Sequence, residues 1–139
     1  MKLALAFVLL ATPALLAAPA YADDFIYFHT PSDNIHCVLM SGDFAGVRCD
    51  MLALTQSFPK RPPDCDLDWG DAFEVGSNDR QGHVVCHGDT VISPDSMELG
   101  YGASATLGEF RCSSEPTGMT CTNRHGHGFA ITKAAQKLF

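Results

Sequence analysis

The sequence predicts an all-β protein, a small antiparallel barrel or sandwich of about eight or nine short strands. Clusters of proline, glycine and aspartate recur about every 8 to 12 residues, and residues 23–139 contain no long apolar run with the period of a helix. A second observation is the unit of an apolar residue, any residue and then cysteine, which has the two-residue period of a half-buried strand. This unit begins at five positions: Ile35, Val47, Val84, Phe110 and Met119.

The N-terminus has the features of a secretory signal peptide over residues 1–22. Lys2 supplies the positive start, residues 3–16 are mainly apolar, and Ala20-Tyr21-Ala22 is a small-x-small cleavage site. The apolar run is too short for a comfortable membrane span. We therefore expect a periplasmic or extracellular protein whose residues 23–139 form one domain.

The charge of the chain is acidic. The formal net charge is −7, and it becomes −8 when Lys2 is removed with the signal peptide. Nucleic acids and anionic membranes attract basic surfaces, so this balance argues against both as partners. The acidic net charge is consistent with a basic exported protein or a cation as partner, or with a surface that only keeps the protein soluble.

The cysteines are expected to form disulfide bonds, because an even number in an exported chain indicates a disulfide framework. Facing residues of an antiparallel hairpin lie within disulfide reach, which favours Cys37–Cys49 and Cys112–Cys121. Cys65–Cys86 follows by elimination. With every cysteine oxidised, a thiolate nucleophile is not expected.

The first half of the domain is expected to form one strand and one hairpin. Residues 25–29 form the first strand, and the turn-forming residues 30–34 end it. Residues 35–40 then pair with residues 47–52. The segment 57–65 contains Pro59, Pro62 and Pro63, and it is expected to be an ordered or tethered loop.

The second half is expected to contain further short strands at 72–75, 82–87, 97–101 and 128–131. The hairpin Glu109–Asn123 is the clearest element, with a turn over Ser113 to Gly118. The last residues, Lys133 to Phe139, can form a short C-terminal helix with Thr132 as N-cap.

Several sequence blocks stand in order along the mature chain and together resemble a known family. The blocks are Thr30-Pro31-Ser32-x-Asn34-Ile35-x-Cys37, Val47-Arg48-Cys49-Asp50, Asp64-Cys65-Asp66-Leu67-Asp68-Trp69-Gly70, Cys86-x-Gly88-Asp89-Thr90, Leu99-x-Tyr101-Gly102, Gly118-x-Thr120-Cys121-x-Asn123 and Gly126-His127-Gly128-Phe129. The resemblance is to small exported bacterial proteins classed as a domain of unknown function. It implies export, paired cysteines and β structure, and it assigns no catalytic residue. Asp33 departs from the glycine expected in that turn.

Two groups of side chains are candidate binding sites. The histidines His83, His87, His125 and His127 alternate within extended segments and could hold zinc or copper through neutral nitrogens. The alternative is that His127 is a structural residue of a tight corner, hydrogen-bonded to a nearby carbonyl.

The second group is the acidic patch of Asp64, Asp66, Asp68 and Trp69. Three carboxylates suggest calcium, but Trp69 occupies the position where an EF-hand loop has glycine. The alternative is a solvated turn that anchors Trp69, the single tryptophan, to the core.

The sequence contains no Gly-x-Ser-x-Gly elbow, His-Glu-x-x-His pair or nucleotide-binding glycine loop. We therefore expect a non-enzymatic binding or envelope-associated module without a cofactor. The alternatives are an acidic inhibitor of a basic secreted enzyme such as lysozyme, and a histidine-based metal-handling protein.

Overall fold

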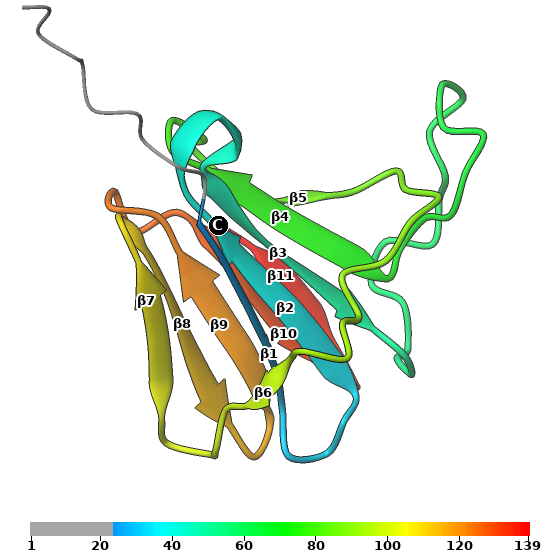
Figure 1. The fold of residues 1–139 in the computed structure, drawn as a ribbon. Helices are drawn as coiled ribbons and strands as arrows, with labels where there is room; N and C mark the ends of the chain where they lie inside the picture. Colours follow the sequence, from blue (N-terminus) through cyan, green and yellow to red (C-terminus); the bar gives the residue numbers. More distant parts are fainter. Residues whose placement is uncertain (1–23) are drawn as a thin grey trace, which may run out of the picture.

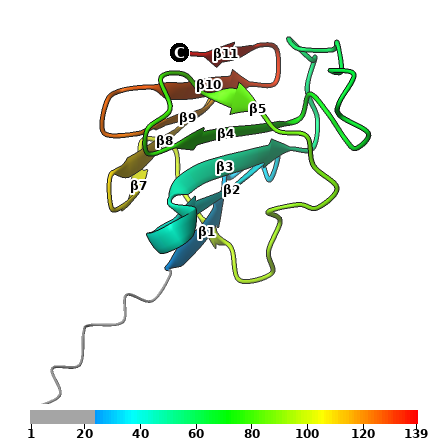
Figure 2. The same ribbon diagram turned by 90° about the horizontal axis from the view of Figure 1, so that it is seen from above.

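The computed structural model describes residues 24–139, so the predicted signal peptide lies outside the described part of the chain. Within that part, eleven strands form two sheets that pack face to face (Figures 1 and 2). This arrangement confirms the predicted all-β class, and of the two architectures expected it is the sandwich.

The first sheet has six strands in the order β5-β4-β3-β2-β1-β6. Neighbouring strands are antiparallel, except that β6 runs parallel to β1. A single 3-10 turn, η1 (Gly42–Phe44), connects β2 and β3. The strands are β1 (Phe25–His29), β2 (Ile35–Met40), β3 (Gly46–Met51), β4 (Ala72–Gly76), β5 (His83–Val84) and β6 (Met97–Glu98).

The second sheet is an antiparallel meander in the order β11-β10-β9-β8-β7. Each of its strands pairs with the next one along the chain, because every connection is a short turn. The strands are β7 (Ser104–Leu107), β8 (Phe110–Glu115), β9 (Gly118–Thr122), β10 (Gly128–Thr132) and β11 (Gln136–Leu138).

The disulfides join Cys37 to Cys49, Cys65 to Cys86 and Cys112 to Cys121, the same three pairs expected from the sequence. The first and third are pairs of directly facing residues within one sheet. Loops of this length stabilise a fold by about 3 kcal/mol each in the chain-entropy model. Three bridges are consistent with an oxidising compartment.

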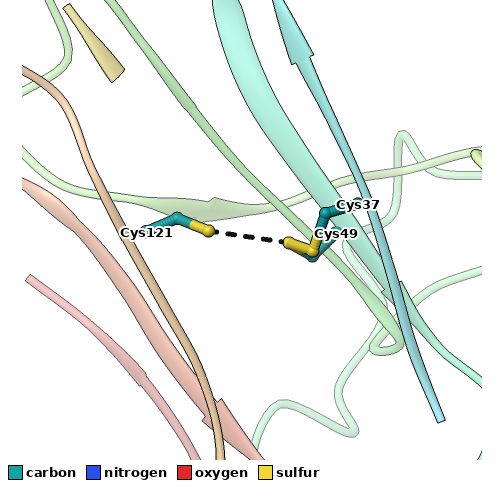
Figure 3. Close-up of side chains that lie close together, drawn as sticks. All are labelled: Cys37, Cys49 and Cys121. Atoms are coloured by element: carbon teal, nitrogen blue, oxygen red, sulfur yellow. Dashed lines mark hydrogen bonds between the residues drawn. A yellow bond between two sulfur atoms is a disulfide. The ribbon is translucent and has the colours of Figure 1, made fainter. Parts of the chain in front are cut away.

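The core lies between the two sheets and contains two of the disulfides. Cys49 Sγ and Cys121 Sγ are 3.7 Å apart, so the two bridges touch across the sandwich (Figure 3). Because disulfide sulfurs carry no proton, this is a van der Waals contact. The fully buried rings of Phe73 and Phe129, one from each sheet, have centroids 6.3 Å apart and add to the same core.

Three details of the sequence prediction are corrected by the structure. There are eleven strands among residues 24–139 rather than eight or nine, because β7 and β11 form where no strand was expected. The turn of the second disulfide hairpin is limited to Pro116 and Thr117, since β8 continues to Glu115. The strand expected over 82–87 is confined to His83–Val84.

The C-terminal helix was also a wrong prediction. Residues Gln136–Leu138 form β11 instead, paired with β10. The Thr132 hydroxyl, expected to cap a helix, donates to the Ala135 carbonyl and accepts from the Ala135 amide, which closes a turn. Gln136 is then buried and donates to the carbonyls of Thr55 and Thr132. A helix would expose this side chain and leave the edge of β10 unpaired.

Two long connections lie outside the sandwich core. Residues 52–71, between β3 and β4, project from one end of the molecule (Figure 1). Residues 85–96 cross from β5 to β6, the opposite edge of the first sheet, on the side away from the second sheet (Figure 2). Among residues 24–139 no helix has the length and apolarity of a membrane span.

Candidate functional site

A row of polar side chains lies on the outer face of the six-stranded sheet. His29, His36 and Asp50 are cross-strand partners on β1, β2 and β3. They alternate with the core residues Phe28 and Cys37, so they point away from the core. The crossing segment 85–96 covers this face, which explains why polar residues there are buried.

The two histidines of this row lie against each other. The rings of His29 and His36 are stacked, with centroids 5.6 Å apart and planes at 28°. His29 Nδ1 is 2.9 Å from Ser96 Oγ at the end of the crossing segment. His36 is 6% exposed, and its Nδ1 is buried without a hydrogen-bond partner. An unpaired buried nitrogen costs about 1–3 kcal/mol, and such groups require an explanation.

Asp33 completes the group from the turn between β1 and β2. Its Oδ1 is 3.3 Å from His36 Nε2, and its carbonyl oxygen is 3.1 Å from the same nitrogen. The residue has φ 57°, and it is the only non-glycine residue with positive φ among those described. That conformation suits glycine, so Asp33 occupies this position at a conformational cost.

The arrangement can hold a metal ion. His29, Asp33 and His36 each offer one ligand atom, and these atoms all lie within 4.8 Å of one another. Adjacent ligands of a tetrahedral zinc site, with bonds of about 2.0–2.2 Å, are about 3.3–3.6 Å apart. The separation of 3.3 Å between Asp33 Oδ1 and His36 Nε2 already matches that spacing. The other separations are at most 4.8 Å, so reaching this spacing requires shifts of at most about 1 Å.

Beside this group lies a fully paired ionic network. Arg48 Nε and Nη2 donate to the two carboxylate oxygens of Asp50 at 2.8 and 3.1 Å, and Nη1 donates to Asp89 Oδ1 at 2.9 Å. Asp50 also accepts from the Val91 amide at 3.0 Å. Burial lowers the pKa of Arg48, but the bonds to Asp50 and Asp89 outweigh it and raise that pKa. Arg48 in turn holds the pKa of Asp89 below its usual value. This network fastens the crossing segment to the sheet.

His87 extends the network. Its Nδ1 lies 2.7 Å from the Asp89 carbonyl oxygen, and its Nε2 lies 2.9 Å from Asp71 Oδ1. Both neighbours are acceptors, so the site favours the protonated imidazole, in which both ring nitrogens donate. Burial lowers the pKa of His87, but the hydrogen bond to Asp71 and the Asp89 carbonyl outweigh it, and the pKa is raised.

The four histidines predicted as metal ligands lie in different surroundings. His125 and His127 line a common cavity, and His83 lies 3.6 Å from Asp79 and 4.0 Å from Glu74. Both nitrogens of His87 contact acceptors of the ionic network. Among residues 24–139, the donor groups that converge within 4.8 Å are His29–Asp33–His36 and the three core cysteines, the latter held in disulfides. The four-histidine site stays a prediction.

The predicted acidic patch lies on the projecting connection. Asp64, Asp66 and Asp68 are exposed, whereas Trp69 is half-buried and its indole Nε1 donates to the Phe58 carbonyl at 2.9 Å. The carboxylates belong to neither of the two converging groups, and calcium binding here also stays a prediction.

Sequence reasoning missed the group of possible ligands His29, Asp33 and His36. Two of these residues are cross-strand partners whose register depends on how the intervening turn folds. The one available signal was Asp33. It places an aspartate carboxylate at a turn position where glycine was expected.

The chain was compared with known proteins. Neither the curated proteins nor the solved structures yield a match. A family model described as a family of unknown function matches residues 4–139, nearly the whole length, and agrees with the resemblance found in the sequence. The chain therefore belongs to that family of unknown function, DUF6636.

Proposed function

We propose that this protein is an exported metal-binding module, with His29, Asp33 and His36 as ligands of a zinc or copper ion. The observation that carries the proposal is the convergence of three donors, two imidazoles and one carboxylate, within 4.8 Å of one another. The proposal keeps the predicted metal-handling function and assigns it to other residues.

The donor types favour a transition metal. Two imidazoles and one carboxylate suit zinc, copper and related ions, whereas magnesium and calcium require mainly oxygen ligands. The Ser96 hydroxyl is hydrogen-bonded to His29 Nδ1, so Nε2 of that ring remains available to bind the metal. This outer contact orients the ligand, as second partners of metal-bound histidines commonly do. Three protein ligands leave a coordination position for water or an exchangeable group.

The backbone of Asp33 supports the same function. A non-glycine residue in the left-handed region costs about 1–2 kcal/mol, although aspartate tolerates it better than most. The side chain is 72% exposed and its only ion-pair partner among the described residues is His36. A carboxylate kept at this cost beside two histidines is expected where it binds a ligand.

Calorimetric titration of the untagged, metal-free protein with Zn²⁺ or Cu²⁺ tests the proposal. We expect one ion per chain, and a loss of affinity in Asp33→Gly of at least the roughly 10–100-fold that removing an outer partner of a metal ligand causes. Glycine accepts the backbone conformation of this position, so the variant removes the carboxylate without harming the turn. His36→Gln should have the same effect.

His127→Ala and His83→Ala are the matched controls, and they should bind as the natural chain does. If these variants lose the metal and Asp33→Gly retains it, the site lies at the four predicted histidines and our assignment is wrong. Absence of saturable binding in the natural chain would reject metal binding altogether.

A second candidate function is binding to a basic exported protein. It is favoured by residues 64–68, whose three aspartates surround Leu67, itself 52% exposed. The Cys65–Cys86 bridge tethers this segment to the domain. A basic enzyme such as lysozyme should be captured at low salt, and the triple Asp→Asn variant at positions 64, 66 and 68 should abolish capture. Equal capture by that variant would exclude this surface.

A further inference from the structure

The cavity lined by His125 and His127, of ≈ 500 Å³, lies between one loop from each sheet. The β4–β5 loop contributes Asn78, Asp79 and Arg80, and the β9–β10 loop contributes His125 and His127. This cavity shares no residue with the metal ligands described above. It brings together side chains that are 45 or more positions apart in the sequence.

A single buried residue, Asn123, holds the two loops in place. Its amide nitrogen donates to the carbonyls of Gly76 and Asp79 at 3.0 and 2.9 Å. Its amide oxygen accepts from the backbone amides of His125 and His127 at 3.0 and 3.1 Å. Both donor hydrogens and both acceptor positions of the side chain are therefore used. The cavity is preorganised by this bridge rather than assembled by a ligand.

One of the two histidines that line the cavity, His125, is also held in its orientation by a neighbouring side chain. Arg124 Nε donates to His125 Nε2 at 3.1 Å, so the neutral ring carries its proton on Nδ1 and can donate it. Arg124 is itself fixed by Glu109, whose Oε2 lies 3.3 Å from Nη1. This chain of contacts makes His125 a hydrogen-bond donor even when the ring is uncharged.

The remaining wall residues add donors. Within residues 24–139 the guanidinium of Arg80 has no hydrogen bond or ion pair, and the Asn78 amide has no side-chain partner. Asp79 is the one acidic wall residue, and its Oδ2 already accepts from the Gly76 amide at 2.7 Å and faces His83. A donor-rich cavity contrasts with the chain as a whole, which has 16 acidic and 9 basic residues.

We infer that this cavity binds a small tetrahedral oxyanion, a phosphate or phosphate monoester. Arg80 supplies a bidentate, charge-assisted contact, and Asn78, His125 and His127 supply single donors from other directions. A carboxylate offers two coplanar oxygens and would leave part of this set unused. The volume leaves room for the group to which a phosphate is attached. Free phosphate and a phosphorylated lipid headgroup share this chemistry.

Calorimetric titration of the metal-free protein with inorganic phosphate tests the inference. We expect one phosphate per chain, and about tenfold weaker binding in Arg80→Gln. Arg61→Gln is the matched control, because it removes the same charge from the proline-rich loop outside the cavity. It should bind as the natural chain does. His36→Gln should also retain phosphate binding, so failure of the metal proposal leaves this one standing.

Sedimentation with vesicles distinguishes the two sources of phosphate. Vesicles of phosphatidylcholine with phosphatidic acid are compared with phosphatidylcholine alone. Binding of phosphatidic acid that depends on Arg80 assigns the cavity to lipid headgroups, and binding of free phosphate alone assigns it to soluble ligands. No saturable binding of either up to about 10 mM phosphate, or equal losses in Arg80→Gln and Arg61→Gln, overturns the inference.

Discussion

Replacing Asp50 by alanine should be among the most destabilising changes on the outer face of the sheet. The Asp50 carboxylate is 5% exposed, and it accepts two hydrogen bonds from Arg48 and one from the Val91 amide. The change leaves the Arg48 guanidinium, whose side chain is 10% exposed, with a single carboxylate neighbour. Removing one partner of a buried ion pair costs about 3–5 kcal/mol of the free energy of unfolding.

Asp89→Ala provides the contrast, because it removes the other carboxylate partner of Arg48. The Asp89 side chain is 79% exposed, and exposed pairs contribute about 0–1 kcal/mol. The Asp89 carbonyl, which accepts from Arg48 Nη2 and lies beside His87 Nδ1, belongs to the main chain and survives the substitution. We therefore expect a loss of at most about 1 kcal/mol.

Urea unfolding of the oxidised protein, monitored by Trp69 fluorescence, measures the loss of stability in both variants. The slope m should stay constant, so that shifts of the midpoint report stability alone. Arg48→Met combined with Asp50→Ala should be less destabilised than the sum of the single changes by about 1–3 kcal/mol, since no buried charge remains unpaired. Equal losses for Asp50→Ala and Asp89→Ala, or strict additivity in the double variant, would refute the reasoning.

Two further predictions concern pH and the disulfides. The raised pKa of His87 means that its contribution to stability is complete below about pH 6.5 and is lost as the pH rises through the folded-state pKa. The free energy of unfolding should therefore fall with rising pH in the natural chain and fall less in His87→Gln, as measured by urea unfolding across that range. Replacing Cys65 and Cys86 by alanine should change tryptophan fluorescence, because that bridge tethers the connection that carries the indole. Replacing Cys112 and Cys121 should lower global stability by about 2–5 kcal/mol, and a larger global loss from the first pair would contradict this order.

The disulfide hairpins were predictable from sequence because alternation and cysteine spacing are local constraints. In β8, Phe110 and Cys112 alternate with exposed Arg111, and their facing partners on β9 follow the same period. A one-residue slip would turn the cysteines to the solvent face, so the register had one acceptable solution. The exact end of the turn was less constrained, because residues such as Ser113 and Glu115 can continue a strand as readily as begin a loop.

The C-terminal segment could not be assigned by local pattern. Ala134 and Ala135 favour a helix, and Thr132 is a good helix cap, but the same threonine equally closes a turn. What decides between them is the open edge of β10, which exists only after the sheet has formed. Tertiary context therefore overrides a weak helical preference here.

The proposed metal ligands were hidden from sequence analysis for a related reason. His29 and His36 are seven positions apart and lie on different strands, so the two-residue period within one strand does not relate them. They meet because the turn residues 30–34 set the register that places Phe28 opposite Cys37. That turn needs a residue with positive φ, and its occupant is Asp33, the third of the proposed ligands. The same turn residue thus helps to set the pairing of the histidines and supplies the carboxylate. A family member with glycine at this position should keep the turn and lack the third proposed ligand.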